Sequence, residues 1–130
     1  MRRLLLTFAL SMLICVSAKA EELKPMKLTV YTPQSCPGTV TASGAKVREG
    51  IVAASRDHLG GCALVYTRDG EFIGFYECLD TGKGKIQKDG RGAIECGYVL
   101  DMWFPDMDAA SEILKMTQGN ILVQFVEAEG

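Results

Sequence analysis

Two segments, Glu77-Cys78-Leu79-Asp80-Thr81-Gly82 and the later Gly97-Tyr98-Val99-Leu100-Asp101-Met102-Trp103-Phe104, share one pattern. In each segment an aspartate stands at the end of an apolar, strand-like run. A carboxylate among apolar side chains is costly unless it is paired, hydrogen-bonded or used in chemistry. Two such residues in one small domain suggest acid/base chemistry, with Asp80 and Asp101 as the candidates.

Short alternating apolar runs surround these segments and predict a mainly β domain. Besides the two opening segments, the predicted strands cover residues 27–31, 39–42, 50–54, 63–66, 72–76 and 121–126. Asp69-Gly70 is a strong hairpin signal between two of these strands. One helix is predicted to begin at Asp106 or Asp108, to end at Gly119-Asn120, and to turn Met107, Ala110, Ile113 and Leu114 inward. Such an order is typical of a small barrel, but periodicity alone does not separate a barrel from a sandwich.

The first twenty residues are predicted to be a signal peptide. Met1-Arg2-Arg3 forms a basic region, residues 4–16 form an apolar region, and Ala18-Lys19-Ala20 is a small-x-small cleavage signal. The apolar run is shorter than the roughly 20 residues that span a bilayer. We therefore expect an exported protein, secreted or in the cell envelope, with a single domain over residues 21–130 and no stable membrane span after cleavage.

The charge balance narrows the class of partner. The chain has 14 basic and 16 acidic residues, and loss of Arg2, Arg3 and Lys19 with the signal leaves a net charge of −5. A nucleic-acid partner would need a basic stripe, which is not visible, so we expect no nucleic acid. The acidity also argues against tight binding to anionic wall polymers, but it is compatible with a neutral glycan.

Four cysteines follow the predicted signal peptide, and in an exported chain they predict two disulfides. Cys62 and Cys78 lie nearly opposite each other in the predicted hairpin, which leaves Cys36 for Cys96. Cys78 with Cys96 would instead close the glycine-rich stretch between them, and the sequence leaves this choice open. A metal site is disfavoured because no CxxC spacing is present and His58 is the only histidine, so we expect no cofactor.

The stretch between residues 81 and 97 is rich in glycine and carries four basic residues, Lys83, Lys85, Lys88 and Arg91. Its composition is typical of a solvated loop. The alternative is a loop that borders a substrate groove, where glycines let the backbone approach a ligand closely.

Four motifs in order resemble the three-aspartate (3D) domain, a bacterial cell-wall family, over about residues 27–126. This family has a double-psi β-barrel related to the catalytic barrel of membrane-bound lytic transglycosylase A. The resemblance implies a six-stranded double-psi barrel. The chain departs from the family in one respect, because the segment between Asp80 and Asp101 is about twice the usual length. The motifs are Tyr31-Thr32-Pro33 with Thr41-Ala42-Ser43-Gly44, then Val52-Ala53-Ala54-Ser55-Arg56-Asp57, Cys78-Leu79-Asp80-Thr81-Gly82 and Val99-Leu100-Asp101-Met102-Trp103-Phe104-Pro105-Asp106.

The resemblance also implies roles for individual residues. Asp101 matches the aspartate that acts first as acid and then as base, and Asp80 matches the second family aspartate. Asp57 is the candidate for the first aspartate, whereas the more usual frame of that motif would place Ala53 there. The remaining candidates are predicted to bind substrate: Thr41, Ser43, Thr81 and Trp103. Trp103 would either stack on a sugar ring or pack in the core.

By this resemblance, the protein is expected to cleave peptidoglycan glycan strands as a lytic transglycosylase. A glycoside hydrolase with two carboxylates and an activated water uses the same residue types. The main alternative is a non-catalytic barrel that binds wall polysaccharide, as expansin-like domains do, with both aspartates structural because strand-end carboxylates accept backbone N–H bonds. A third possibility is a disulfide-stapled inhibitor or secreted interaction protein.

Overall fold

The computed structural model describes residues 22–35 and 37–127. The predicted signal peptide and Cys36 lie outside the described residues. No helix in the described part of the chain is long and apolar enough to cross a membrane. The elements in chain order are β1 (Lys24–Tyr31), β2 (Ile51–Ala54), the 3₁₀ turn η1 (Arg56–His58), β3 (Cys62–Thr67), β4 (Phe72–Thr81), β5 (Val99–Trp103), α2 (Met107–Thr117) and β6 (Asn120–Val126).

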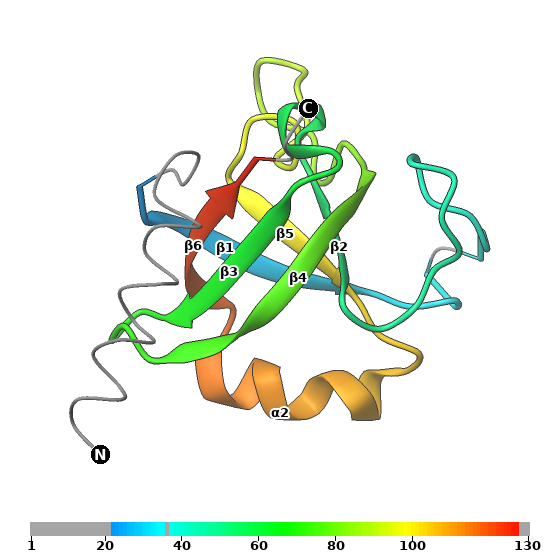
Figure 1. Cartoon of the computed structure of the whole chain (residues 1–130). Coiled ribbons are helices and arrows are strands. Elements are labelled where there is room, and N and C mark those ends of the chain that lie inside the picture. Colours follow the sequence, from blue (N-terminus) through cyan, green and yellow to red (C-terminus); the bar gives the residue numbers. More distant parts are fainter. Residues whose placement is uncertain (1–21, 36, 128–130) are drawn as a thin grey trace.

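The six strands close into a barrel in the order β1-β5-β2-β4-β3-β6 (Figure 1). Two neighbouring pairs are parallel, β1 with β5 and β2 with β4, and the pairs β2/β5, β3/β4, β3/β6 and β1/β6 are antiparallel. The predicted hairpin is confirmed as β3 and β4, joined through a turn in which Gly70 has φ 95°. A mainly β domain with six strands and a helix on its C-terminal side is thus confirmed.

Buried residues alternate along β3, β5 and β6, whereas all four residues of β2 are buried. Leu100 and Met102 of β5 are fully buried, while Val99, Asp101 and Trp103 are half-buried. Helix α2 lies across one end of the barrel (Figure 1) and buries Ala110 and Ile113. Met107 is 53% exposed, so its predicted place in the inward stripe is wrong: it is the first residue of the helix, and the buried residues begin one turn later at Ala110.

The helix boundaries agree with their sequence signals. Ala109 N–H donates to the Asp106 carboxylate at 2.8 Å, so Asp106 is the N-cap. At the other end Gln118 takes the left-handed conformation with φ 52°, and Gly119 follows with φ 76°. These two residues stop the helix just before β6 begins at Asn120.

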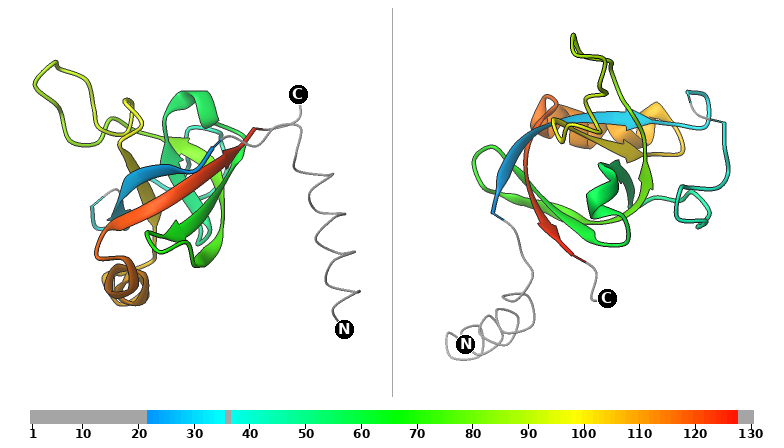
Figure 2. Two further views of the ribbon diagram at one scale, coloured as in Figure 1. Left: turned by 90° about the vertical axis from the view of Figure 1, so that its left-hand side faces the viewer. Right: turned by 90° about the horizontal axis from the view of Figure 1, so that it is seen from above.

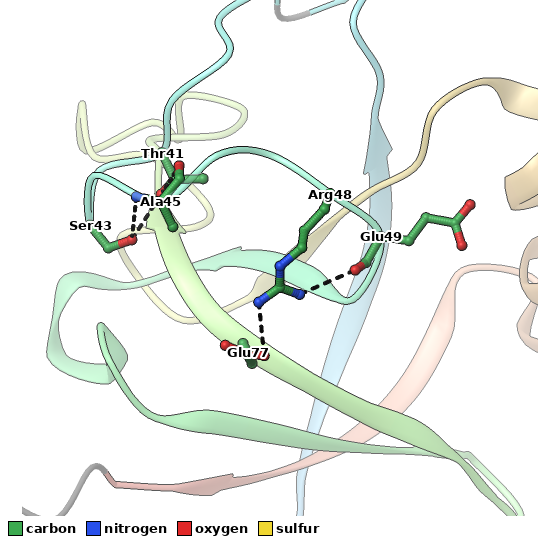
Figure 3. A network of polar contacts seen from close by, with 6 residues as sticks. All are labelled: Thr41, Ser43, Ala45, Arg48, Glu49 and Glu77. Carbon is green, nitrogen blue, oxygen red and sulfur yellow. Dashed lines mark hydrogen bonds and ion pairs between the residues drawn. The ribbon is translucent and has the colours of Figure 1, made fainter.

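The strand predicted over residues 39–42 is wrong, because this segment belongs to a loop. Its one ladder contact is an isolated bridge between Val40 and Lys46. The Thr41 hydroxyl lies 2.8 Å from the Ser43 hydroxyl and 3.0 Å from the Ala45 carbonyl oxygen (Figure 3). Local bonds of this kind compete with a strand ladder for the same backbone groups.

The predicted Cys62–Cys78 disulfide is not formed. The register of β3 and β4 pairs Cys62 with Glu77, one residue short of Cys78. Because side chains alternate along a strand, the half-exposed Cys62 and the fully buried Cys78 belong to opposite faces. Cys62, Cys78 and Cys96 are all free thiols, and burial, with a smaller effect of Cys62, raises the pKa of Cys78 to about 12. No disulfide staples the described residues.

Candidate functional site

The site begins with a row of residues that crosses four neighbouring strands. Thr29 of β1 pairs with Asp101 of β5, and Asp101 pairs in turn with Ala53 of β2. Ala53 then pairs with Asp80 of β4. The small side chain of Ala53 therefore separates the two carboxylates, whose backbones are two strand spacings apart, roughly 10 Å. Asp80 is next to the last residue of β4, whereas Asp101 is the middle residue of β5.

A β-bulge sets the direction of Asp80. Val52 pairs with Cys78, but the next residue, Ala53, pairs with Asp80, so Leu79 is an extra residue in β4. Cys78 faces the core, and strict alternation would turn Asp80 inward as well. The extra residue shifts the alternation and brings Asp80 into the same row as Asp101, as bulges near binding sites commonly do.

Both carboxylates open into one cavity of about 380 Å³, here called the central cavity. Its wall comes from four strands, β1, β2, β4 and β5, from Ser35 in the loop after β1, and from the segment after β4. The lining residues are Thr29, Val30, Tyr31, Ser35, Ala53, Asp80, Thr81, Gly82, Gly84, Ile94 and Asp101.

Asp80 is held by three hydrogen-bond donors. One carboxylate oxygen accepts from the backbone N–H of Ala42 at 3.0 Å and of Thr81 at 2.9 Å. The other accepts from the Tyr31 hydroxyl at 3.1 Å. An ionised carboxylate has acceptor sites only, so it matches all three donors.

Asp101 has a different environment. The Thr29 hydroxyl donates to it at 2.8 Å, and this is the one donor to its carboxylate among the described residues. Burial raises the pKa of Asp101 above its ordinary value; the Thr29 hydrogen bond opposes that rise and the nearby charge of Asp80 adds to it. The row therefore contains one carboxylate anchored by three donors and one, Asp101, whose pKa is raised above the ordinary value of an aspartate.

The loop between β1 and β2 supports Asp80 from outside. Ser43 N–H donates to the Leu79 carbonyl oxygen at 3.1 Å, next to the bond from Ala42 to Asp80. Farther along the loop, Arg48 pairs with Glu77 of β4 at 2.9 Å (Figure 3). Thr41 and Ser43, predicted as substrate-binding residues, bond to each other within this loop and are not part of the cavity lining.

Of the other predicted site residues, some line the central cavity and others do not. Thr81 lines the central cavity, as a binding residue would. Asp57 is exposed on η1 and is not part of the lining, whereas Ala53 occupies the position between the two carboxylates. Trp103 pairs with Tyr31 at the end of the β1/β5 ladder, half-buried, with an indole nitrogen that lacks a partner among the described residues.

Three groups that hold the carboxylates were not predicted from the sequence. They are the hydroxyls of Thr29 and Tyr31 and the backbone N–H of Ala42. Thr29 stands at an outward position of an alternating strand, which signals exposure but not a partner 72 residues away. Within the described residues, no cluster of three His, Cys, Asp or Glu side chains gathers to hold a metal ion.

None of the known protein families matches this chain, and no curated protein matches its sequence.

Proposed function

We propose that this protein is an exported enzyme that cleaves peptidoglycan glycan strands between N-acetylmuramic acid and N-acetylglucosamine, as a lytic transglycosylase. The observation that carries the proposal is the pair of unlike carboxylates in one open cavity. Burial and the neighbouring Asp80 raise the pKa of Asp101, and an acid catalyst near neutral pH needs such a shift. Export rests on the signal-like pattern of residues 1–20.

In the first step Asp101 acts as general acid. Its proton passes to the bridging oxygen as the bond from that oxygen to the anomeric carbon of N-acetylmuramic acid breaks. The bonding electron pair leaves with the oxygen, and positive charge develops at the anomeric carbon. Asp80, anchored by three donors, supplies a fixed negative charge on the same face of the barrel.

In the second step the Asp101 carboxylate acts as general base. It accepts the proton of the sugar's own C6 hydroxyl while that oxygen bonds to the anomeric carbon. The products are a 1,6-anhydro end and a free hydroxyl on the leaving sugar, without consumption of water. Thr29 holds Asp101 in place through both steps as a positioning residue.

The strand pairing supports the barrel topology that accompanies this chemistry. Parallel pairs β1/β5 and β2/β4 are joined by the antiparallel pair β2/β5, so two parallel units meet at Asp101 and Ala53. We propose that this arrangement is a double-psi barrel of the three-aspartate type. In that frame Ala53 occupies a position that an aspartate fills in other members, and Asp80 and Asp101 perform the chemistry without it.

The test is mass spectrometry of soluble products after incubation of the protein with purified peptidoglycan. Wild-type protein should release anhydro-ended muropeptides, and Asp101→Asn should release none while keeping its fold. Asp69→Asn, a change in the exposed β3–β4 turn, is the matched control and should retain activity. Reducing ends would indicate a hydrolase instead. No products from wild type, with retained sedimentation onto the wall material, would indicate a polysaccharide-binding barrel.

A further inference from the structure

The central cavity continues on both sides into two further depressions. One, of about 500 Å³, is lined by Lys27, Thr29, Lys85, Gln87 and Tyr98, among others, and is called the Tyr98 depression. The other, of about 300 Å³, is lined by Arg56, Thr81, Gly82, Lys83 and Glu95, and is called the Arg56 depression. Thr29 belongs to the central cavity and the Tyr98 depression, while Thr81 and Gly82 belong to the central cavity and the Arg56 depression. The three hollows thus form one groove with the carboxylates in its middle.

A single hairpin contributes to all three parts of this groove. Residues 82–97 project from the barrel in both views of Figure 2, and backbone bonds from Ile94 to Lys83 and from Ala93 to Lys85 close the base of the hairpin. Gly84 lines the central cavity, whereas Lys83 and Lys85 line the depressions on opposite sides of it. The hairpin base therefore straddles the site.

The position of the hairpin base across the central cavity depends on Gly84. Its φ is 70°, and a Cβ at this position would lie 2.8 Å from the Ile94 Cγ1 atom. No other residue type fits without a shift of Ile94, itself part of the cavity wall. The sequence Lys83-Gly84-Lys85 consequently places one lysine in the wall of the depression on each side of the cavity.

The charges along the groove alternate in sign. Cationic side chains predominate on both flanks, with Lys27 and Lys85 on one side and Arg56 and Lys83 beside the single acid Glu95 on the other, while Asp80 and Asp101 occupy the middle. The described residues form two ion pairs, Arg48–Glu77 and Arg91–Asp89, and neither involves Lys83 or Lys85. A chain with more acidic than basic residues thus gathers unpaired cations at this groove.

We propose that Lys83 and Lys85 bind acidic substituents of the substrate on either side of the bond at Asp101, so that the preferred substrate is a glycan strand carrying carboxylate-bearing peptide stems rather than a bare glycan. This inference rests on the proposed function. An acidic group at the centre would meet Asp80 and Asp101 and be repelled, whereas each flank has more cationic than acidic side chains. The order of charges along the groove therefore determines where a stem-bearing glycan strand binds relative to Asp101, as well as how tightly it binds.

The test compares peptidoglycan strands that carry peptide stems with the same strands stripped of stems by an amidase. The proteins are wild type, the double variant Lys83→Gln/Lys85→Gln, and the control Lys88→Gln, whose residue is exposed near the hairpin tip and lines none of the three depressions. KM for stem-bearing strands should rise about tenfold in the double variant, since two exposed charge contacts are lost. KM for stripped strands, kcat, and both constants of Lys88→Gln should remain near the wild-type values.

A binding measurement keeps this inference separate from the proposed function. Each lysine variant is combined with Asp101→Asn, and the affinity for both kinds of strand is measured without turnover. A preference for stem-bearing strands that disappears in the double variant and weakens with added salt supports the inference, even if wild type shows no cleavage. An equal loss of affinity for both strands, or an equal effect of Lys88→Gln, overturns it.

Discussion

Replacement of Asp80 by alanine or by asparagine separates its structural role from its electrostatic role. Asp80→Ala removes the acceptor of three hydrogen bonds, from the N–H groups of Ala42 and Thr81 and from the Tyr31 hydroxyl. Asp80→Asn retains an oxygen for the two backbone donors, and its amide group donates to the Tyr31 oxygen instead. The two variants therefore differ in hydrogen bonding but share the loss of charge.

The expected magnitudes follow from the surroundings of each donor. Ala42 is exposed, so water replaces its lost bond at little cost, whereas Thr81 is half-buried and Tyr31 is 7% exposed. A bond lost at a shielded donor costs about 1–1.5 kcal/mol. Asp80→Ala should thus lower the free energy of unfolding by roughly 2–3 kcal/mol, and Asp80→Asn by less than about 1 kcal/mol.

Urea unfolding followed by circular dichroism measures these differences. The exposed Asp57→Ala serves as control and should change the free energy of unfolding by no more than about 0.5 kcal/mol. Equal destabilisation by Asp80→Ala and Asp80→Asn would refute the assignment of Asp80 as the anchor of the loop. Under the proposed function both variants lose turnover, and full activity of Asp80→Asn would show that its charge is not needed.

Four further outcomes are expected. Thr29→Val removes the hydrogen bond that lowers the pKa of Asp101, so the fall of activity at alkaline pH should begin at a higher pH in a rate profile. Asp101→Asn should unfold at a higher urea concentration than wild type near neutral pH, but not in acid. The pKa of Asp101 is raised in the folded state, so its contribution to stability is present in acid and is lost as the pH rises through the folded pKa, whereas asparagine stays neutral. Asp106→Ala should lower the free energy of unfolding by about 1 kcal/mol through loss of the α2 N-cap. Gly92→Ala would place a Cβ 1.9 Å from the Lys83 carbonyl oxygen, so proteolysis of the hairpin should accelerate, whereas Gly38→Ala, with open space around it, should have no such effect.

The site depends on a local departure from regular β structure. The extra residue Leu79 in β4 turns Asp80 away from the core and into line with Asp101. The same bulge puts the Leu79 carbonyl oxygen within reach of Ser43 N–H, which ties the β1–β2 loop to the strand. One irregularity thus orders the loop and the carboxylate together.

Local patterns in the sequence determined much of the fold. Alternation of apolar side chains predicted β1, the β3–β4 hairpin and β6, and Asp106 with Gly119 bounded α2, because these signals act over a few neighbouring residues. Aspartates that follow apolar residues also predicted that Asp80 and Asp101 need partners, since the cost of an unsatisfied carboxylate can be read from its neighbours, and both line the central cavity.

Register and long-range contacts were decided only by the tertiary structure. A shift of one residue between β3 and β4 sets Cys62 against Glu77 and removes a disulfide that the sequence suggested. The bond from Thr29 to Asp101 joins strands far apart in the chain. Side-chain direction in a sheet reverses with each residue, so small shifts in pairing that sequence patterns do not specify decide which groups meet.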